Sequence, residues 1–131
     1  MKELKEHKYH SEEFDIDINR YLTYAQIQQI ANAVRKTETW SERQQTSDML
    51  LLYHATNIGK EELEKLGHDV LLQSGLIDEV KEIVENYYSI YNAIQYEESI
   101  EKSLTKIVKE LPKIMQPLEQ VMSKHGNSIK K

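Results

Sequence analysis

The residues of this chain best suited to acid–base or metal chemistry are its five histidines. His7 and His10 form an H-x-x-H pattern, and Glu12 and Glu13 follow them closely. Imidazoles and carboxylates are ligands that zinc takes, but a metal site also needs its ligands held in a fixed geometry. Because no rigid element is predicted around this N-terminal stretch, we expect neither a metal nor another cofactor there.

The remaining histidines and the carboxylates form no catalytic constellation. His54 follows Tyr53 and is expected at the rim of a core, while His68 and His125 lie beside glycines at predicted helix ends. Glycine-rich phosphate loops, G-x-S-x-G and H-E-x-x-H are absent from the sequence. The acidic residues of 78–101 are spaced along the outer face of a helix and do not converge on a pocket. The sequence therefore predicts a protein that is not an enzyme.

The elements that would carry function are helical, because apolar residues recur at heptad spacing in the second half of the chain. Two ladders step by four and three residues: Val80, Val84, Tyr87, Tyr91 and Ile94, and then Leu104, Val108, Leu111, Met115, Leu118 and Met122. Ile94 and Leu104 are ten residues apart, so the seam changes phase around residues 96–99, where the helix must turn or be overwound. The pattern predicts a long C-terminal helical pair.

The N-terminal residues have a different periodicity. Residues 14–19 alternate apolar and polar side chains, which is the pattern of a strand. Since no second strand pattern is evident, we expect residues 1–20 to form an extended arm. Such an arm lies on the surface, moves freely, or adds to the sheet edge of another protein.

Capping residues and glycines mark the helix ends. Two pairs match the capping box: Thr23 with Gln26, and Ser41 with Gln44. They predict one helix beginning at Thr23 and a second over about 42–57. Trp40 then lies just before the second cap, where we expect it to anchor the helix in the core.

Further helices are expected in the remaining two thirds of the domain. Their ranges are 60–66, 68–73, 76 to about 96, and from Ser99 onward, with kinks at Pro112 and Pro117. The predicted fold is thus all-α, a helical bundle with a heptad-patterned C-terminal helical pair and an extended N-terminal arm. We divide the chain into an arm (1–20), a helical domain (21–125) and a basic tail (126–131).

Charge is distributed unevenly along the 131 residues, whose net charge is -5. Residues 60–101 hold three Lys or Arg against eleven Asp or Glu, and residues 102–131 hold seven against two. The two segments could attract each other within one chain or between subunits, or simply be solvated. Nucleic acid is an unexpected partner, because only the tail approaches a basic footprint. A membrane is also unexpected, because no run of 18 apolar residues occurs.

Tyrosine is used more than the other aromatic residues, with eight Tyr against one Phe and one Trp. Tyr87, Tyr88 and Tyr91 occupy adjacent turns of a predicted helix. A tyrosine buries its ring and keeps its hydroxyl wet, which suits core edges and subunit interfaces. The sequence leaves both core packing and an intersubunit aromatic patch open.

Residues 21–30 and 48–55, together with the helical C-terminal half, are similar to small helical proteins of tailed bacteriophages. The Tyr-Leu-Thr-Tyr start before a helix resembles head–tail connector or neck proteins. The resemblance covers about a fifth of the chain, contains no functional motif and transfers no site residue. It implies helical packing into rings, arms that contact neighbouring chains, and a location in the host cytoplasm during assembly and then in the virion.

We therefore expect a non-enzymatic structural or assembly protein of a phage particle, whose partners are copies of itself or other phage structural proteins. The expected contact residues are Phe14, Ile16, Ile18, Tyr87, Tyr88 and Tyr91. An alternative is a small acidic inhibitor or regulator that binds a host protein through Glu79, Glu82 and Glu85. A third is a helix-turn-helix DNA-binding regulator, whose second helix would present polar side chains to bases and phosphates. Those side chains are Ser41, Arg43, Gln44, Gln45, Thr46 and Ser47.

Overall fold

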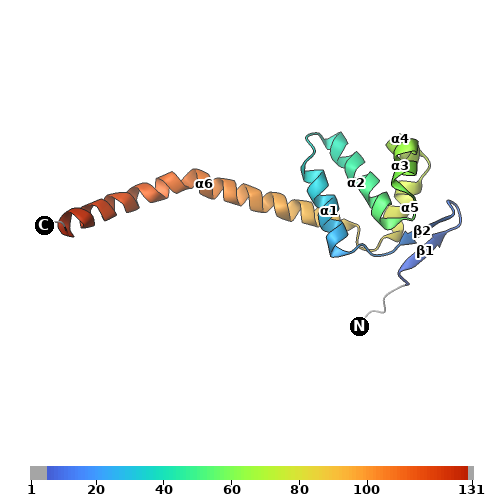
Figure 1. The fold of residues 1–131 in the computed structure, drawn as a ribbon, viewed down its shortest axis with the longest axis horizontal. Coiled ribbons are helices and arrows are strands. Elements are labelled where there is room, and N and C mark those ends of the chain that lie inside the picture. The colour runs from blue at the N-terminus through green and yellow to red at the C-terminus, as the bar shows by residue number, and fades with distance from the viewer. Residues whose placement is uncertain (1–5, 130–131) are drawn as a thin grey trace. The chain divides into compact units, whose positions relative to one another are not determined.

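The computed structural model describes the backbone of residues 6–129 and the side chains of residues 6–113. The chain divides into two compact units, Met1–Gln95 and Tyr96–Lys131 (Figure 1). The elements are β1 (Lys8–Ser11), β2 (Ile16–Asn19), α1 (Tyr24–Arg35), α2 (Trp40–Ala55), α3 (Lys60–Leu66), α4 (His68–Gln73), α5 (Leu76–Ile83) and α6 (Tyr88–Ile129). The fold is therefore mostly helical, as predicted, with a small two-stranded sheet.

The expected N-terminal arm is a β-hairpin instead, and the prediction of an unpaired arm over 1–20 is wrong for the hairpin residues. β1 pairs antiparallel with β2, with Tyr9 opposite Ile18. On its other side β2 meets Thr56 through an isolated bridge, and Ile18 is fully buried. Polar residues dominate β1, so the alternation that marks a strand is missing from it. The hairpin satisfies the backbone of β2 internally.

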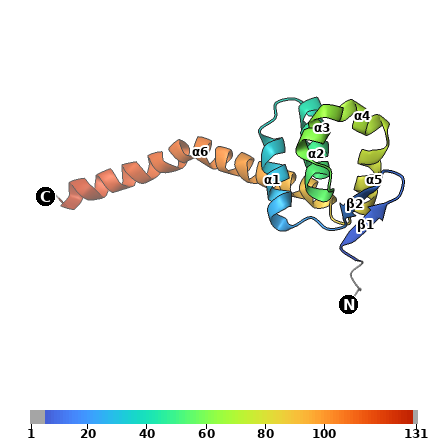
Figure 2. The same cartoon turned by 45° about the vertical axis from the view of Figure 1, so that its right-hand side comes forward.

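The core of the first unit forms where one face of α1 meets α2 and the shorter helices close over them (Figure 2). The predicted apolar face of α1 is confirmed, and its buried members are Ile27, Ile30, Ala31 and Val34. The capping box of Thr23 and Gln26 is also confirmed, with Gln26 N–H donating to Thr23 Oγ1 at 3.2 Å. Local sequence signals thus fix the start and the buried side of α1.

The predicted continuous helix over 76–96 is wrong, because the chain leaves helical geometry between α5 and α6. Val84 has an extended backbone, with ψ of 110°. The side chain of Asn86 accepts from Leu22 N–H at 2.8 Å and donates to the Leu22 carbonyl at 3.0 Å. Glu85 N–H donates to the Arg20 carbonyl at 2.7 Å. These bonds satisfy the backbone after β2, which an unbroken helix could not do.

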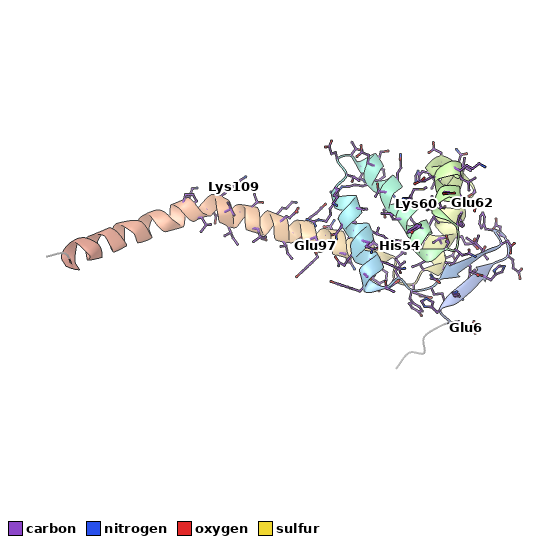
Figure 3. All side chains as sticks on the ribbon, in the orientation of Figure 1. Glu6, His54, Lys60, Glu62, Glu97 and Lys109 are labelled. Atoms are coloured by element: carbon purple, nitrogen blue, oxygen red, sulfur yellow. The ribbon has the colours of Figure 1, made fainter. Side chains whose placement is uncertain are left out.

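The sequence leaves a turn or local overwinding of the helix open at residues 96–99. The turn is wrong, because α6 is helical from Tyr88 to Ile129. The expected helical pair is therefore one helix, and the expected tail at 126–131 is helical as far as Ile129. Figure 1 shows that α6 bends within the second unit, near the residue that Figure 3 labels as Lys109. Pro112 lacks the N–H that would bond to the Val108 carbonyl, which is a sufficient cause for a bend.

The second helix begins two residues earlier than its capping pattern predicts. Thr39 is the N-cap, and its Oγ1 accepts from Glu42 N–H at 3.1 Å. Trp40 is therefore the first residue of α2, and its side chain is 78% exposed. The expectation that Trp40 anchors the core is wrong.

We predict that Thr39→Ala lowers the free energy of unfolding by about 1 kcal/mol, because it removes the hydroxyl that caps α2. Ser41→Ala is the matched control, since Ser41 is exposed and is not the cap; its effect should stay within about 0.5 kcal/mol. Urea denaturation followed by circular dichroism measures both. A larger loss for Ser41→Ala would show that α2 begins where the sequence pattern placed it.

Candidate protein-interaction surfaces

A groove of about 360 Å³ opens in the first unit between the end of α1, α2 from Trp40 to Leu51, α5 and the start of α6. Its apolar lining is Val34, Leu51, Ile90 and Ile94; its aromatic lining is Trp40, Tyr87 and Tyr91; its polar lining is Arg43, Gln44, Ser47, Lys81 and Gln95. The volume is within the range of ligand and side-chain pockets. We call this site the aromatic groove.

The aromatic residues of this groove are exposed although they stand beside the core. Trp40 is 78% exposed and Tyr91 64%, whereas Ile90 and Ile94 at the same groove are buried. Exposed Trp and Tyr around an apolar floor are typical of protein–protein interfaces. The structure brings the predicted Tyr87 and Tyr91 together here, but predicted Tyr88 is exposed and does not line the groove.

Trp40 lines the groove, whereas the sequence analysis assigned it to the core. The position of Trp40 relative to α2 depends on which hydroxyl caps the helix, and both Thr39 and Ser41 carry a hydroxyl that could do so. Thr39 followed three residues later by Glu42 is also a capping pattern, and it would have placed Trp40 inside the helix. That signal was present in the sequence.

A buried carboxylate lies below the groove and joins three helices. Asp48 of α2 is 2% exposed, and its Oδ1 is 2.9 Å from Lys81 Nζ of α5. Its Oδ2 is 2.8 Å from Nε2 of His68, the first residue of α4. Of these three residues, Lys81 alone lines the groove, so the carboxylate and the imidazole do not face it as an acid–base pair. The cluster is an internal ionic tie.

Two basic side chains line the groove. Arg43 and Lys81 are among its lining residues, and no carboxylate is. Asp48 offsets part of the Lys81 charge from below.

The predicted contact residues of the hairpin do not line the aromatic groove. Ile18 is fully buried in the core of its own chain, so its assignment as a contact with another chain is wrong. Phe14 and Ile16 are partly buried against the same core and line a second groove of about 510 Å³. Leu66 and Val70 also line that groove. This second groove remains partly open.

The predicted acidic face does not form one helical surface. Glu79 is half-buried, and its Oε2 accepts from Ser11 Oγ at 3.0 Å. Glu82 is exposed on α5, but Glu85 follows the end of that helix. The break between α5 and α6 therefore separates carboxylates that the sequence placed on one side of a helix.

The helix-turn-helix reading meets a steric difficulty. α1 and α2 do follow each other, and Ser41 and Gln45 are exposed. However, Arg43, Gln44 and Ser47 line the aromatic groove beside tyrosines of the same chain. Part of the polar face expected to read bases therefore lines a groove instead of projecting from the domain.

The second unit exposes an apolar stripe along α6. Its described members are Ile100, Leu104, Ile107, Val108 and Leu111, which are 38–62% exposed. The α-helical repeat of 3.6 residues places them on one side. The heptad ladder found Leu104, Val108 and Leu111 but not the two isoleucines. Its later members, Met115, Leu118 and Met122, lie outside the described side chains.

The lysines of the described part of α6 share one side. By the same helical repeat, Lys102, Lys106, Lys109 and Lys113 occupy the side opposite the stripe, and Glu98 lies beside Lys109 there. Glu97 and Glu101 adjoin the stripe, and Glu110 lies between the two sides. Figure 3 labels one residue of each kind, Glu97 and Lys109. The lysines therefore face away from the stripe, whereas carboxylates occur on both sides of α6.

The H-x-x-H pattern does not gather around a common point. His7 stacks with Tyr21, whereas His10 Nδ1 is 2.8 Å from Asp17 Oδ1. Within residues 6–113, no group of three or more His, Cys, Asp or Glu side chains is arranged to hold a metal ion. Across the described chain, no helix combines the length and the apolar character needed to cross a membrane.

Comparison of the chain with protein-family models, with curated proteins and with solved structures finds no match.

We predict that Asp48→Ala lowers the free energy of unfolding by about 3 kcal/mol, because it leaves Lys81 without its buried counter-charge and His68 without its hydrogen-bond partner. Glu82→Ala removes an exposed carboxylate of α5 and should change the same quantity by less than about 0.5 kcal/mol. Urea denaturation measures both values. Similar losses for the two variants would mean that the ionic tie contributes nothing specific.

We also predict opposite titration shifts for two histidines. The hydrogen bond that the His10 imidazole donates to the Asp17 carboxylate raises the pKa of His10 above 6.5, and partial burial lowers the pKa of His54 below 6.5. Protonated His10 thus favours the fold at low pH, and this contribution is lost as the pH rises through its raised pKa. Neutral His54 favours the fold at higher pH, and this contribution is lost as the pH falls through its lowered pKa.

An NMR titration of the imidazole protons resolves the two midpoints. Asp17→Asn should bring the pKa of His10 back toward 6.5 and leave that of His54 unchanged. An unchanged His10 midpoint in this variant would contradict the assigned cause.

Proposed function

We propose that this protein is a non-enzymatic assembly protein that binds other protein chains through the apolar stripe of α6. The observation that carries the proposal is the exposure of five large aliphatic side chains, Ile100 to Leu111, on one side of a helix. Leaving apolar surface in water costs roughly 25 cal/mol per Å². Contiguous exposed apolar patches mark interaction sites. A partner that covers the stripe recovers this free energy.

The proposal contains no catalytic step. The polar lining of the aromatic groove is cationic or amide-like, with one serine, and includes no histidine or carboxylate that could act as a base. The buried Asp48 and His68 do not line that groove. These arrangements favour binding over chemistry.

The setting that we propose is the tailed-phage particle, on the strength of the resemblance of residues 21–30 and 48–55. In this setting the protein acts first in the host cytoplasm during assembly and then in the virion. Its partners are further copies of itself or other structural proteins of the particle. Helical packing between such subunits gives the exposed stripe a purpose.

The test is site-specific photo-crosslinking in the cells that make the protein. A benzophenone amino acid at Val108 lies on the stripe, and the same residue at Lys109 lies on the lysine side as a matched control. We expect protein adducts from Val108 at several times the yield from Lys109, and loss of these adducts when Leu104→Gln is added. Equal, low yields at both positions would contradict the proposed function.

A further inference from the structure

We propose that α6 pairs with α6 of a second copy of this chain, antiparallel, along the apolar stripe, and that the pair is centred near Lys113. This inference rests on the proposed function and names the partner of the stripe. The described part of the second unit is a single stretch of helix, and every described side chain from residue 99 to residue 113 is exposed. A lone helix has no neighbouring element in its unit against which to bury an apolar side. The stripe therefore needs a partner from elsewhere.

The spacing of the stripe matches the seam of a coiled coil. In the heptad positions a to g, Leu104 and Leu111 are d residues and Val108 is an a residue. Ile107 takes the flanking position g. Along the helical backbone beyond the described side chains, the same three positions hold Ile114, Met115, Leu118, Val121 and Met122. Between residues 102 and 124 no charged residue occupies a, d or g, so pairing along this seam buries no charge.

The order of the seam residues selects a second copy as the partner. From residue 104 to residue 122 the a and d residues are 4, 3, 4, 3 and 4 positions apart, which is the same order from either end. In an antiparallel pair each a residue faces a d residue, so one register matches all six with the six of the other copy. A shift by one heptad matches only four of them. The layers of the full register are Leu104 with Met122, Val108 with Leu118, and Leu111 with Met115.

The residues at position g favour the antiparallel order over the parallel one. A parallel pair brings g of one helix beside e of the other, where this chain has a threonine, a proline and a glutamate. An antiparallel pair brings g beside g, so that Ile107 lies next to Val121 and Ile114 next to its own copy. The antiparallel order thus gives both isoleucines an aliphatic neighbour.

The seam is also large enough for a stable pair. From residue 104 to residue 122 the a, d and g positions hold nine aliphatic or methionine side chains. Burying one such side chain removes roughly 60–120 Å² of apolar surface from water. The nine together approach the ~800 Å² that each partner of a standard-size interface buries. Because the same surface serves in both copies, the interface is isologous and ends at two chains.

Light scattering across protein concentrations tests the pairing. We expect the wild type to rise from the 15.4 kDa of one chain to a plateau at twice that mass. Leu104→Gln with Val108→Gln removes two seam residues and should weaken association at least about tenfold. Lys102→Gln with Lys106→Gln has the same spacing on the lysine side and should associate like the wild type. All four side chains are exposed, so neither variant disturbs the core of the first unit.

Distances between nitroxide labels test the orientation. The chain has no cysteine, so Lys102→Cys and Lys113→Cys each create a single labelling site on the exposed lysine side. In the proposed register the two labels at 113 lie level with each other, whereas residue 102 of one copy lies level with residue 124 of the other. The labels at 102 are then offset along the helix axis by about 33 Å. Pulsed electron paramagnetic resonance should give a distance at 102 that exceeds the distance at 113 by about 10 Å or more.

Contrary results at either step would overturn the inference. Equal distances at 102 and 113 would show a parallel pair. A plateau above two chains would show that the seam does not close in a pair, and equal losses in the two glutamine variants would show that the stripe is not the contact. A wild type that is monomeric at every concentration would exclude self-association, yet adducts between Val108 and a different protein would still support the proposed function.

Discussion

The paired hydrogen bonds between the side chain of Asn86 and the backbone of Leu22 determine where α5 ends and α6 begins. The amide matches one backbone N–H and one carbonyl, at 2.8 and 3.0 Å, and the next backbone bond ties Glu85 to Arg20. Because the chain turns there, Ile90 and Ile94 are buried and Tyr91 stands at the groove. An uninterrupted helix would have continued the direction of α5, and the groove depends on the interruption.

The buried Asp48 is a second constraint on the packing of the first unit. One carboxylate with an ion pair to Lys81 and a hydrogen bond to His68 relates the positions of α2, α5 and α4. Burying a charge is costly unless its partners are well placed, so the tie is sensitive to the register of all three helices. The lysine that it holds is also a cation of the groove, which links the internal packing to the electrostatics of the surface.

Features that depend on neighbouring residues could be predicted from the sequence, and those that depend on distant pairs could not. The cap at Thr23, the buried face of α1 and the short helices after Gly59 are local patterns, and the structure has them. The strand pairing of β1 with β2 and the hydrogen bonds of the Asn86 side chain depend on particular partners elsewhere in the chain. The residue types involved do not by themselves indicate those partners. Heptad spacing identified part of the α6 stripe. It also wrongly predicted a continuous helix across the turn at Val84, because Val80, Val84 and Ile94 are all buried by contacts with other elements and not along one helical seam.

The two-stranded sheet leaves the outer side of β1 without a neighbouring strand in the described part of the chain. An open strand edge presents a row of backbone donors and acceptors on which further strands can add, the first step of amyloid-like growth. β1 is four residues long and includes Lys8 and His10, both exposed. A short, charged edge is a poor template for such growth. The polar composition that concealed β1 as a strand therefore also protects the protein against aggregation through its sheet.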